Sequence, residues 1–289
     1  MKNKKIYILF FILLALCLTG CKKETKTETD PLVFSSDVEY KSSYDGKQGN
    51  AGPLQGNTII ISFFTSDKNT KWTDSKADEK AKKNVLKRLK DATEYLSKNA
   101  AEYGKKLTFI YDWEKYSDLM YLAEFEKDLV ISTGNNYYLQ KSLIEKNIKT
   151  QTLKNKYHAD NIVYFFFLNT SFDNMIKPWT ITHNNCDYCN VEFTNLFIRF
   201  NNKFTAASTF AHEMMHQFGA PDFYYANEYI PQNYVDYLDS IKSKDLMFYI
   251  NYGSSIESKF TDLDAYYVGI APRPAEANRW NLGKNEYEK

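Results

Sequence analysis

The chain has 289 residues, of which 43% are hydrophobic and 25% are charged, and its formal net charge at pH 7 is +1. This composition is typical of a globular protein rather than a disordered chain, and the 20 Phe and 23 Tyr can build a substantial core. The charges are balanced and form no polybasic patch, which argues against binding to nucleic acid.

The N-terminus has the features of an export signal. Three lysines among the first five residues precede an apolar run over residues 6–18, which is too short to be a good transmembrane span. The run ends in LTGC at residues 18–21, a sequence that resembles a bacterial lipobox. We therefore expect cleavage before Cys21, lipidation of Cys21, and an anchored protein in the cell envelope on the extracytoplasmic side. An ordinary secretory signal is the alternative.

These features predict three parts of the chain. Residues 1–20 form a lipoprotein signal peptide, residues 21–56 form a flexible polar tether, and residues 57–289 form one folded domain. Removal of the signal takes three of the 37 basic residues and none of the 36 acidic ones, which leaves a net charge of −2. We expect a monomer that meets the membrane only through its lipid.

Strands and helices alternate along the predicted domain. Apolar β-branched and aromatic runs predict strands at residues 58–65, 107–113 and 161–168, and helical spacing of apolar residues predicts helices at 73–103 and 137–157. The alternation predicts an α/β fold with a mostly parallel sheet covered by helices. Residues 191–200 should lie near the sheet edge, and short helices at 233–241 and 262–268 should belong to a smaller C-terminal lobe.

The candidate chemistry lies in AHEMMHQFGAPDFYY, residues 211–225. His212 and His216 are four residues apart on a helix expected to begin near residue 205, so both imidazoles leave the same face and can bind one zinc ion. Glu213 follows the first histidine, where its carboxylate can take a proton from a water molecule and pass it to a leaving amine. The later tyrosines of residues 223–237 are expected in the core or at the rim of the cleft, or else in substrate subsites.

A catalytic zinc ion usually has three protein ligands, so a third is needed. Gly219 can end the helix in the left-handed conformation, and Asp222 then comes within reach of the ion. A later carboxylate is the alternative third ligand, and the candidates are Glu228, Asp236 and Asp239.

The pattern H-E-x-x-H-x-x-G-x-x-D at residues 212–222 resembles that of metzincin zinc peptidases in which aspartate replaces the third histidine, as in snapalysin-like and immune-inhibitor-A-like secreted peptidases. By motif, the resemblance covers about residues 205–250. It implies a zincin-like α+β catalytic domain with a mixed, mostly parallel sheet, backing helices, an active-site helix and a smaller C-terminal lobe. In such a domain an edge strand lines the cleft and pairs with an extended peptide.

The segment DLMFY at residues 245–249 resembles the methionine turn that lies beneath the zinc in this group of peptidases. The resemblance implies that Met247 is the turn methionine and that Tyr249 binds the metal or the oxyanion. Met247 could instead be an ordinary core residue.

Cys186 and Cys189 are the cysteines that would remain besides Cys21 once the signal is removed. In an exported protein a disulfide between them is the first expectation. His183 with these two cysteines could suggest a second metal site, but the sequence offers no fourth ligand. The Asn and Asp residues around the cysteines indicate a loop rather than a redox motif.

Together these features predict a lipid-anchored, zinc-dependent metalloendopeptidase that hydrolyses peptide bonds in proteins, with Glu213 as general base. The alternative is an anchored protein that binds peptides or glycans and has a structural or vestigial zinc site.

Overall fold

The computed structural model describes residues 32–34, 51–129, 135–170, 181–183, 191–200 and 203–288. The predicted signal peptide, the lipidation site Cys21 and the possible disulfide between Cys186 and Cys189 lie outside these ranges. Within them, no helix is both long and apolar enough to cross a membrane.

The sheet is centred on two continuous apolar strands, β2 (Gly56–Ser66) and β5 (Asn161–Leu168), which pair in parallel with Ile61 opposite Tyr164. The strand order among the described residues is β1-β4-β2-β5-β7-β6, and β3 lies beside the first part of β2. The other strands are β1 (Leu32–Phe34), β3 (Leu107–Ile110), β4 (Met120–Phe125), β6 (Ile181–His183) and β7 (Phe193–Phe197), with β8 (Arg199–Phe200) and β9 (Lys203–Phe204) forming a separate pair. All pairings in the large sheet are parallel except β6 with β7, which confirms the predicted mostly parallel sheet.

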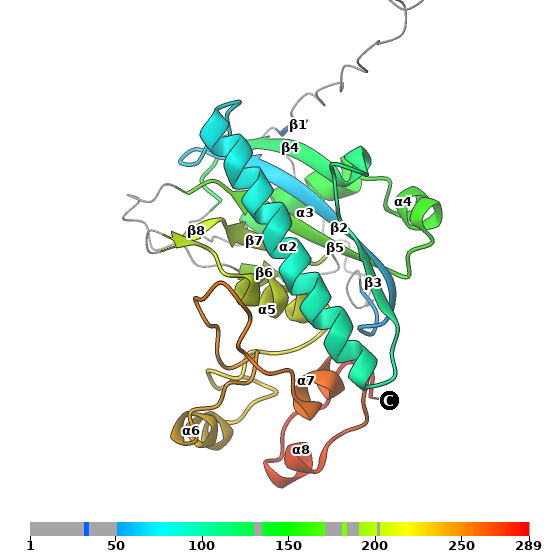
Figure 1. The fold of residues 1–289 in the computed structure, drawn as a ribbon, viewed down its shortest axis with the longest axis vertical. Coiled ribbons are helices and arrows are strands. Elements are labelled where there is room, and N and C mark those ends of the chain that lie inside the picture. The colour runs from blue at the N-terminus through cyan, green and yellow to red at the C-terminus, as the bar shows by residue number, and fades with distance from the viewer. Residues whose placement is uncertain are drawn as a thin grey trace, which may run out of the picture. The chain divides into compact units, whose positions relative to one another are not determined.

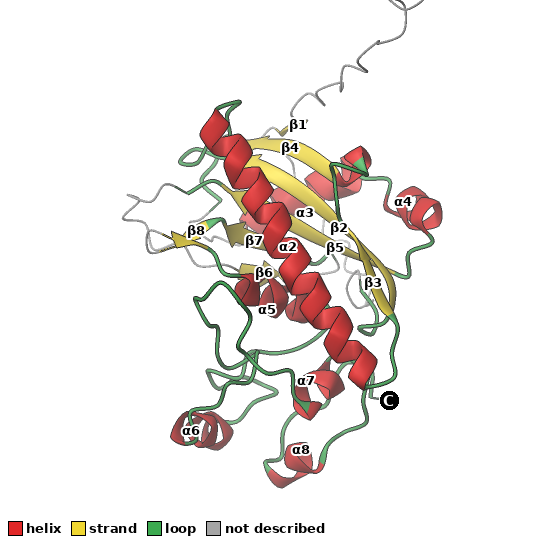
Figure 2. Cartoon of the chain, in the orientation of Figure 1, coloured by secondary structure: helices red, strands yellow, loops and turns green. Residues whose placement is uncertain are grey.

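Helices cover both faces of this sheet, and β5 has no polar face for that reason. Its alternate residues Val163, Phe165 and Phe167 share a core cluster with the long helix α2 (Lys76–Glu102) and with α5 (Ala207–Gln217). The residues between them contact the opposite layer, which contains α3 (Asn135–Asn147) and α4 (Thr150–Tyr157). Figures 1 and 2 show α2 crossing one face of the sheet with α3 behind it.

The single helix predicted over residues 137–157 is wrong, because the chain forms α3 and α4 with a break between them. Lys149 has ψ 67°, outside the helical range, and directly precedes α4. Ile148 and Leu153 are both buried in the same core cluster, so the bend brings apolar residues on either side of it to the sheet. Neither Gly nor Pro marks this break in the sequence. Strand β4 was also missed, since MYLAEF has no continuous apolar run.

The edge of the sheet lies close to α5. The segment predicted near the edge contains β7, and beside it the three-residue β6 is the last strand in the described order. The antiparallel β6 lies against α5.

The C-terminal part of the chain contains α6 (Gln232–Ser240), α7 (Asp262–Tyr267) and α8 (Ala275–Arg279). Figure 1 shows these helices below α5, with the sheet above it. Residues 51–56, which the sequence placed in the tether, join this fold: Leu54 is buried and its N–H donates to the Val268 carbonyl at 2.9 Å.

Candidate metal centre

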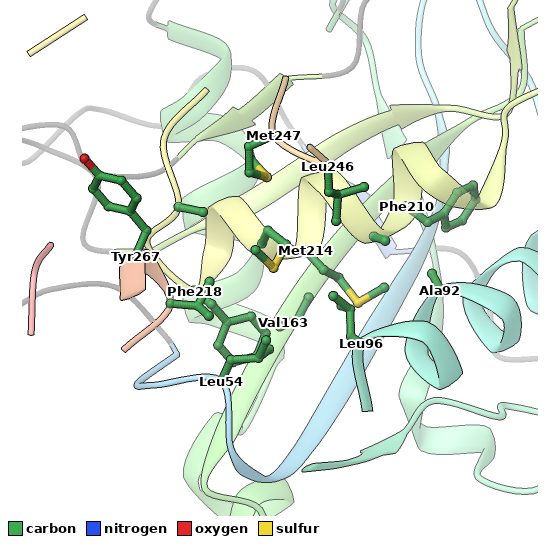
Figure 3. Close-up of a cluster of buried hydrophobic side chains, with 14 of the residues drawn as sticks. Leu54, Ala92, Leu96, Val163, Phe210, Met214, Phe218, Leu246, Met247 and Tyr267 are labelled. Atoms are coloured by element: carbon green, nitrogen blue, oxygen red, sulfur yellow. The ribbon is translucent and has the colours of Figure 1, made fainter. Parts of the chain in front are cut away.

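Helix α5 places His212 and His216 side by side. Their rings lie 4.6 Å apart between centroids, and the two Nε2 atoms are 3.1 Å apart. The whole helix is buried between the α2 side of the sheet and the C-terminal part, so its apolar residues contribute to one continuous core. Figure 3 shows Met214 on this helix, with Leu246 and Met247 from the later turn close to it.

The helix ends as the sequence predicts. Gly219 has φ +92°, and the N–H of Ala220 donates to the Met215 carbonyl at 3.1 Å. The left-handed backbone conformation at Gly219 favours glycine, and a Cβ atom there would lie 2.5 Å from Glu286 Oε1, so that side chain would have to move. The turn brings the Ala220 carbonyl to 2.7 Å from His216 Nδ1 and returns Asp222 to the histidines.

Asp222 completes the cluster. Its Oδ1 lies 3.1 Å from the Nε2 atom of His212 and 3.1 Å from that of His216, and these three side chains form a group whose ligand atoms suit one metal ion. The alternative ligands Glu228, Asp236 and Asp239 are all exposed and do not belong to this group. Among the described residues, the structure thus brings together the three ligands that the sequence predicts.

Hydrogen bonds on the far side of each ring fix which nitrogens face the cluster. Nδ1 of His212 lies 3.0 Å from the Leu246 carbonyl oxygen, and Nδ1 of His216 lies 2.7 Å from the Ala220 carbonyl oxygen. A carbonyl can only accept, so Nδ1 carries the proton in each ring and a neutral imidazole presents a lone pair at Nε2. Two lone pairs and the carboxylate of Asp222 therefore converge on one point.

A metal cation fits this arrangement. Tetrahedral zinc with bonds of 2.0–2.2 Å separates its ligand atoms by about 3.3–3.5 Å, close to the three separations of 3.1 Å in the cluster. Asp222 Oδ1 is buried and has no hydrogen bond of satisfactory geometry. A bond to a metal ion would satisfy this oxygen.

The electrostatics of the site also favour a cation. Burial lowers the pKa of His216, but the nearby Asp222 carboxylate, helped by Glu213, outweighs burial and raises the pKa to about 9. For Asp222, burial raises the pKa, while the two histidines lower it well below its usual range. Without a metal ion, this raised pKa favours a proton on His216 that faces Asp222. A metal ion at the same place would displace that proton and leave the neutral ring with its lone pair at Nε2.

Glu213 is buried beside the cluster, as expected for the residue after His212. A second side chain close to the two carboxylates is Tyr224, whose ring stacks on that of His212 at 6.1 Å between centroids and an interplanar angle of 25°. Tyr224 is 49% exposed, and its partial burial, together with the charges of Asp222 and Glu213, raises its pKa. The sequence does not distinguish Tyr224 from the other tyrosines of residues 223–237. Its distinguishing signal is its position two residues after Asp222.

Residues 245–249 form a tight turn against α5. Met247 is fully buried, and its carbonyl accepts a hydrogen bond at 2.9 Å from the N–H of Phe223, next to Asp222. The turn thus supports both His212, through the Leu246 carbonyl, and the segment that carries Asp222. Tyr249 ends this turn with a side chain that is 38% exposed, and its role at the metal stays a prediction.

No protein-family model matches the chain, and no curated protein matches it either.

Proposed function

We propose that the protein is a zinc-dependent endopeptidase in which His212, His216 and Asp222 hold the metal. The observation that supports this most strongly is the convergence of two imidazole lone pairs and one carboxylate beside a second, buried carboxylate, Glu213. A structural zinc site needs ligands but no base, whereas hydrolysis needs both.

A zinc ion bound here would supply Lewis-acid chemistry, because it lowers the pKa of a water molecule to about 7 and polarises a carbonyl group. Glu213 would take the proton from the attacking water and return it to the departing amine. Tyr224 would donate a hydrogen bond to the carbonyl oxygen as that oxygen becomes negative, since its ring already stacks on His212.

The substrate we propose is a peptide segment of a protein. The edge strand β6 lies against α5, and a sheet edge can pair with an extended peptide through main-chain hydrogen bonds. From the N-terminal sequence we also propose a lipid anchor at Cys21 and an extracytoplasmic location, where proteins of the envelope or surroundings would be cleaved.

Glu213→Gln tests this function. The amide keeps the shape of the side chain but cannot act as a base, so cleavage of a fluorogenic peptide library should fall by about 10²–10⁴-fold while zinc content is unchanged. Glu94→Gln, on the exposed face of α2, is the matched control and should behave as wild type. The alternative, an anchored binding protein, predicts a different result. Wild type would then hold one zinc per chain and cleave no peptide, and it would bind peptides or glycans as well as Glu213→Gln does.

A further inference from the structure

Two carboxyl groups are buried close to each other near the turn that supports the candidate metal centre. Asp245 and Asp264 are 5% and 0% exposed, and no ion pair reaches either one within the described part of the chain. Thr261 joins them: its hydroxyl donates to Asp245 Oδ2 at 2.7 Å, and its N–H donates to Asp264 Oδ2 at 2.9 Å. Two adjacent carboxylates in such a place cannot both be ionised, so the pair must share one proton.

The hydrogen bonds decide which residue carries that proton. Asp245 accepts from the Met247 N–H at Oδ1, at 2.8 Å, and from the Thr261 hydroxyl at Oδ2, so both of its oxygens serve as acceptors. Oδ1 of Asp264 is buried and accepts no hydrogen bond from the described residues, while the Asp264 side chain interacts with that of Asp245. A proton on Asp264, donated to Asp245, satisfies both side chains. Burial and then the charge of Asp245 raise the pKa of Asp264 well above its usual range, in line with a proton on Asp264.

The ionised Asp245 sits at the start of the turn that supports the metal ligands. Its side chain fixes the Met247 N–H, and its main-chain carbonyl accepts from Tyr249 at 2.8 Å. The two residues after Asp245 provide the acceptors for the ligand segments, namely the Leu246 carbonyl for His212 and the Met247 carbonyl for Phe223. A change in the Asp245 carboxylate would therefore shift groups that orient two of the three ligands.

We propose that Asp245, kept ionised by a proton held on Asp264, is a positioning residue of the metal centre: it fixes the turn that orients His212 and Asp222. This inference rests on the proposed metal site. It assigns Asp245 no contact with the metal or the substrate, because its effect passes through the carbonyls of Leu246 and Met247.

The Asp245→Asn and Asp264→Asn variants should differ in zinc affinity, although each removes one carboxyl group from the same pair. Asp264→Asn replaces an O–H donor with an N–H donor, so Asp245 keeps all its partners. Asp245→Asn leaves one acceptor oxygen for the Met247 N–H and the Thr261 hydroxyl, and turns its NH2 group toward one of these two donors. We expect Asp245→Asn to weaken zinc binding by about 10–100-fold in a competition titration with a chelator, and Asp264→Asn to stay within about twofold of wild type.

Equal loss in the two variants, or a larger loss in Asp264→Asn, would overturn the proposal, because an ordinary structural pair would tolerate both amides alike. Thr261→Val and Thr261→Ser are the second test should Asp245→Asn fail to fold: the valine removes the donor to Asp245 and should weaken zinc binding, whereas the serine should restore it. Equal zinc binding by these two would also overturn the proposal. A folded wild-type protein that binds no zinc would contradict the proposed function. The free energies of unfolding of the two asparagine variants would then show which aspartate carries the proton.

Discussion

Gln217, the last residue of α5, connects this helix to the sheet through three buried hydrogen bonds. Its Oε1 accepts from the Tyr164 N–H at 3.1 Å, and its Nε2 donates to the Tyr164 carbonyl at 3.1 Å and to Thr194 Oγ1 at 3.0 Å. The amide thus continues the β5 ladder at the place where β7 begins its pairing with Phe165. Gln217→Met keeps the approximate length of the side chain and removes all three hydrogen bonds.

The cost follows from the two main-chain groups of Tyr164. Both face Gln217 in an interior where Tyr164 and Gln217 are 1% exposed, so water cannot replace the lost amide. An unsatisfied buried donor or acceptor costs about 1–3 kcal/mol. The two groups together predict a decrease in the free energy of unfolding of about 2–6 kcal/mol.

Urea unfolding followed by circular dichroism measures this free energy. Gln151→Met is the matched control, because Gln151 lies on the exposed side of α4 and bonds only to the exposed Asn155 among its described hydrogen bonds. The control should stay within about 0.5 kcal/mol of wild type. A decrease of less than 1 kcal/mol for Gln217→Met would contradict this expectation, since the Tyr164 groups would then have found other partners.

Three further predictions follow from the metal centre and its surroundings. Tyr224→Phe should lower kcat/KM by about 10-fold or more with zinc content unchanged, because the hydroxyl is lost and the ring remains. A larger loss of kcat/KM in Tyr249→Phe would instead assign this role to the tyrosine of the turn. Gly219→Ala should reduce the free energy of unfolding by at least about 1 kcal/mol and weaken zinc binding, given its φ of +92° and the nearby Glu286, and an unchanged urea midpoint and zinc affinity would contradict this. Above about pH 4 an unfolded Asp loses its proton, whereas folded Asp264 keeps its proton because its pKa is raised. The free energy of unfolding of wild type should therefore fall with rising pH relative to that of Asp264→Asn, by about 1.4 kcal/mol per pH unit until the raised pKa is reached. Parallel curves of this free energy from pH 4 to pH 7 would contradict the shared proton.

The parts of the fold with a strong local signal could be predicted from the sequence. Strands β2 and β5 are continuous apolar runs because helices cover both their faces, and the pattern is visible without the structure. The spacing of His212, His216 and Asp222 likewise follows from one helix and one glycine turn, which are local features. The structure has both strands where the sequence predicts them and brings the three side chains together, while metal binding by these side chains stays a prediction.

The remaining features depend on contacts between distant parts of the chain. The acceptor for His212 is the main-chain carbonyl of Leu246, and any residue at that position provides one. Asp245 and Asp264 are 19 positions apart in the sequence, and nothing local indicates that Thr261 joins them in the interior. The role of Gln217 depends in the same way on its tertiary contact with Tyr164.

Zinc content by elemental analysis is the most direct test of the central claim, that His212, His216 and Asp222 form a metal site. We would compare wild type with Asp222→Ala and with Asp236→Ala, an exposed carboxylate on α6 that serves as the control. We expect one zinc per chain in wild type and in Asp236→Ala, and much less in Asp222→Ala. Full zinc content in Asp222→Ala, or none in a folded wild-type protein supplied with zinc, would contradict it.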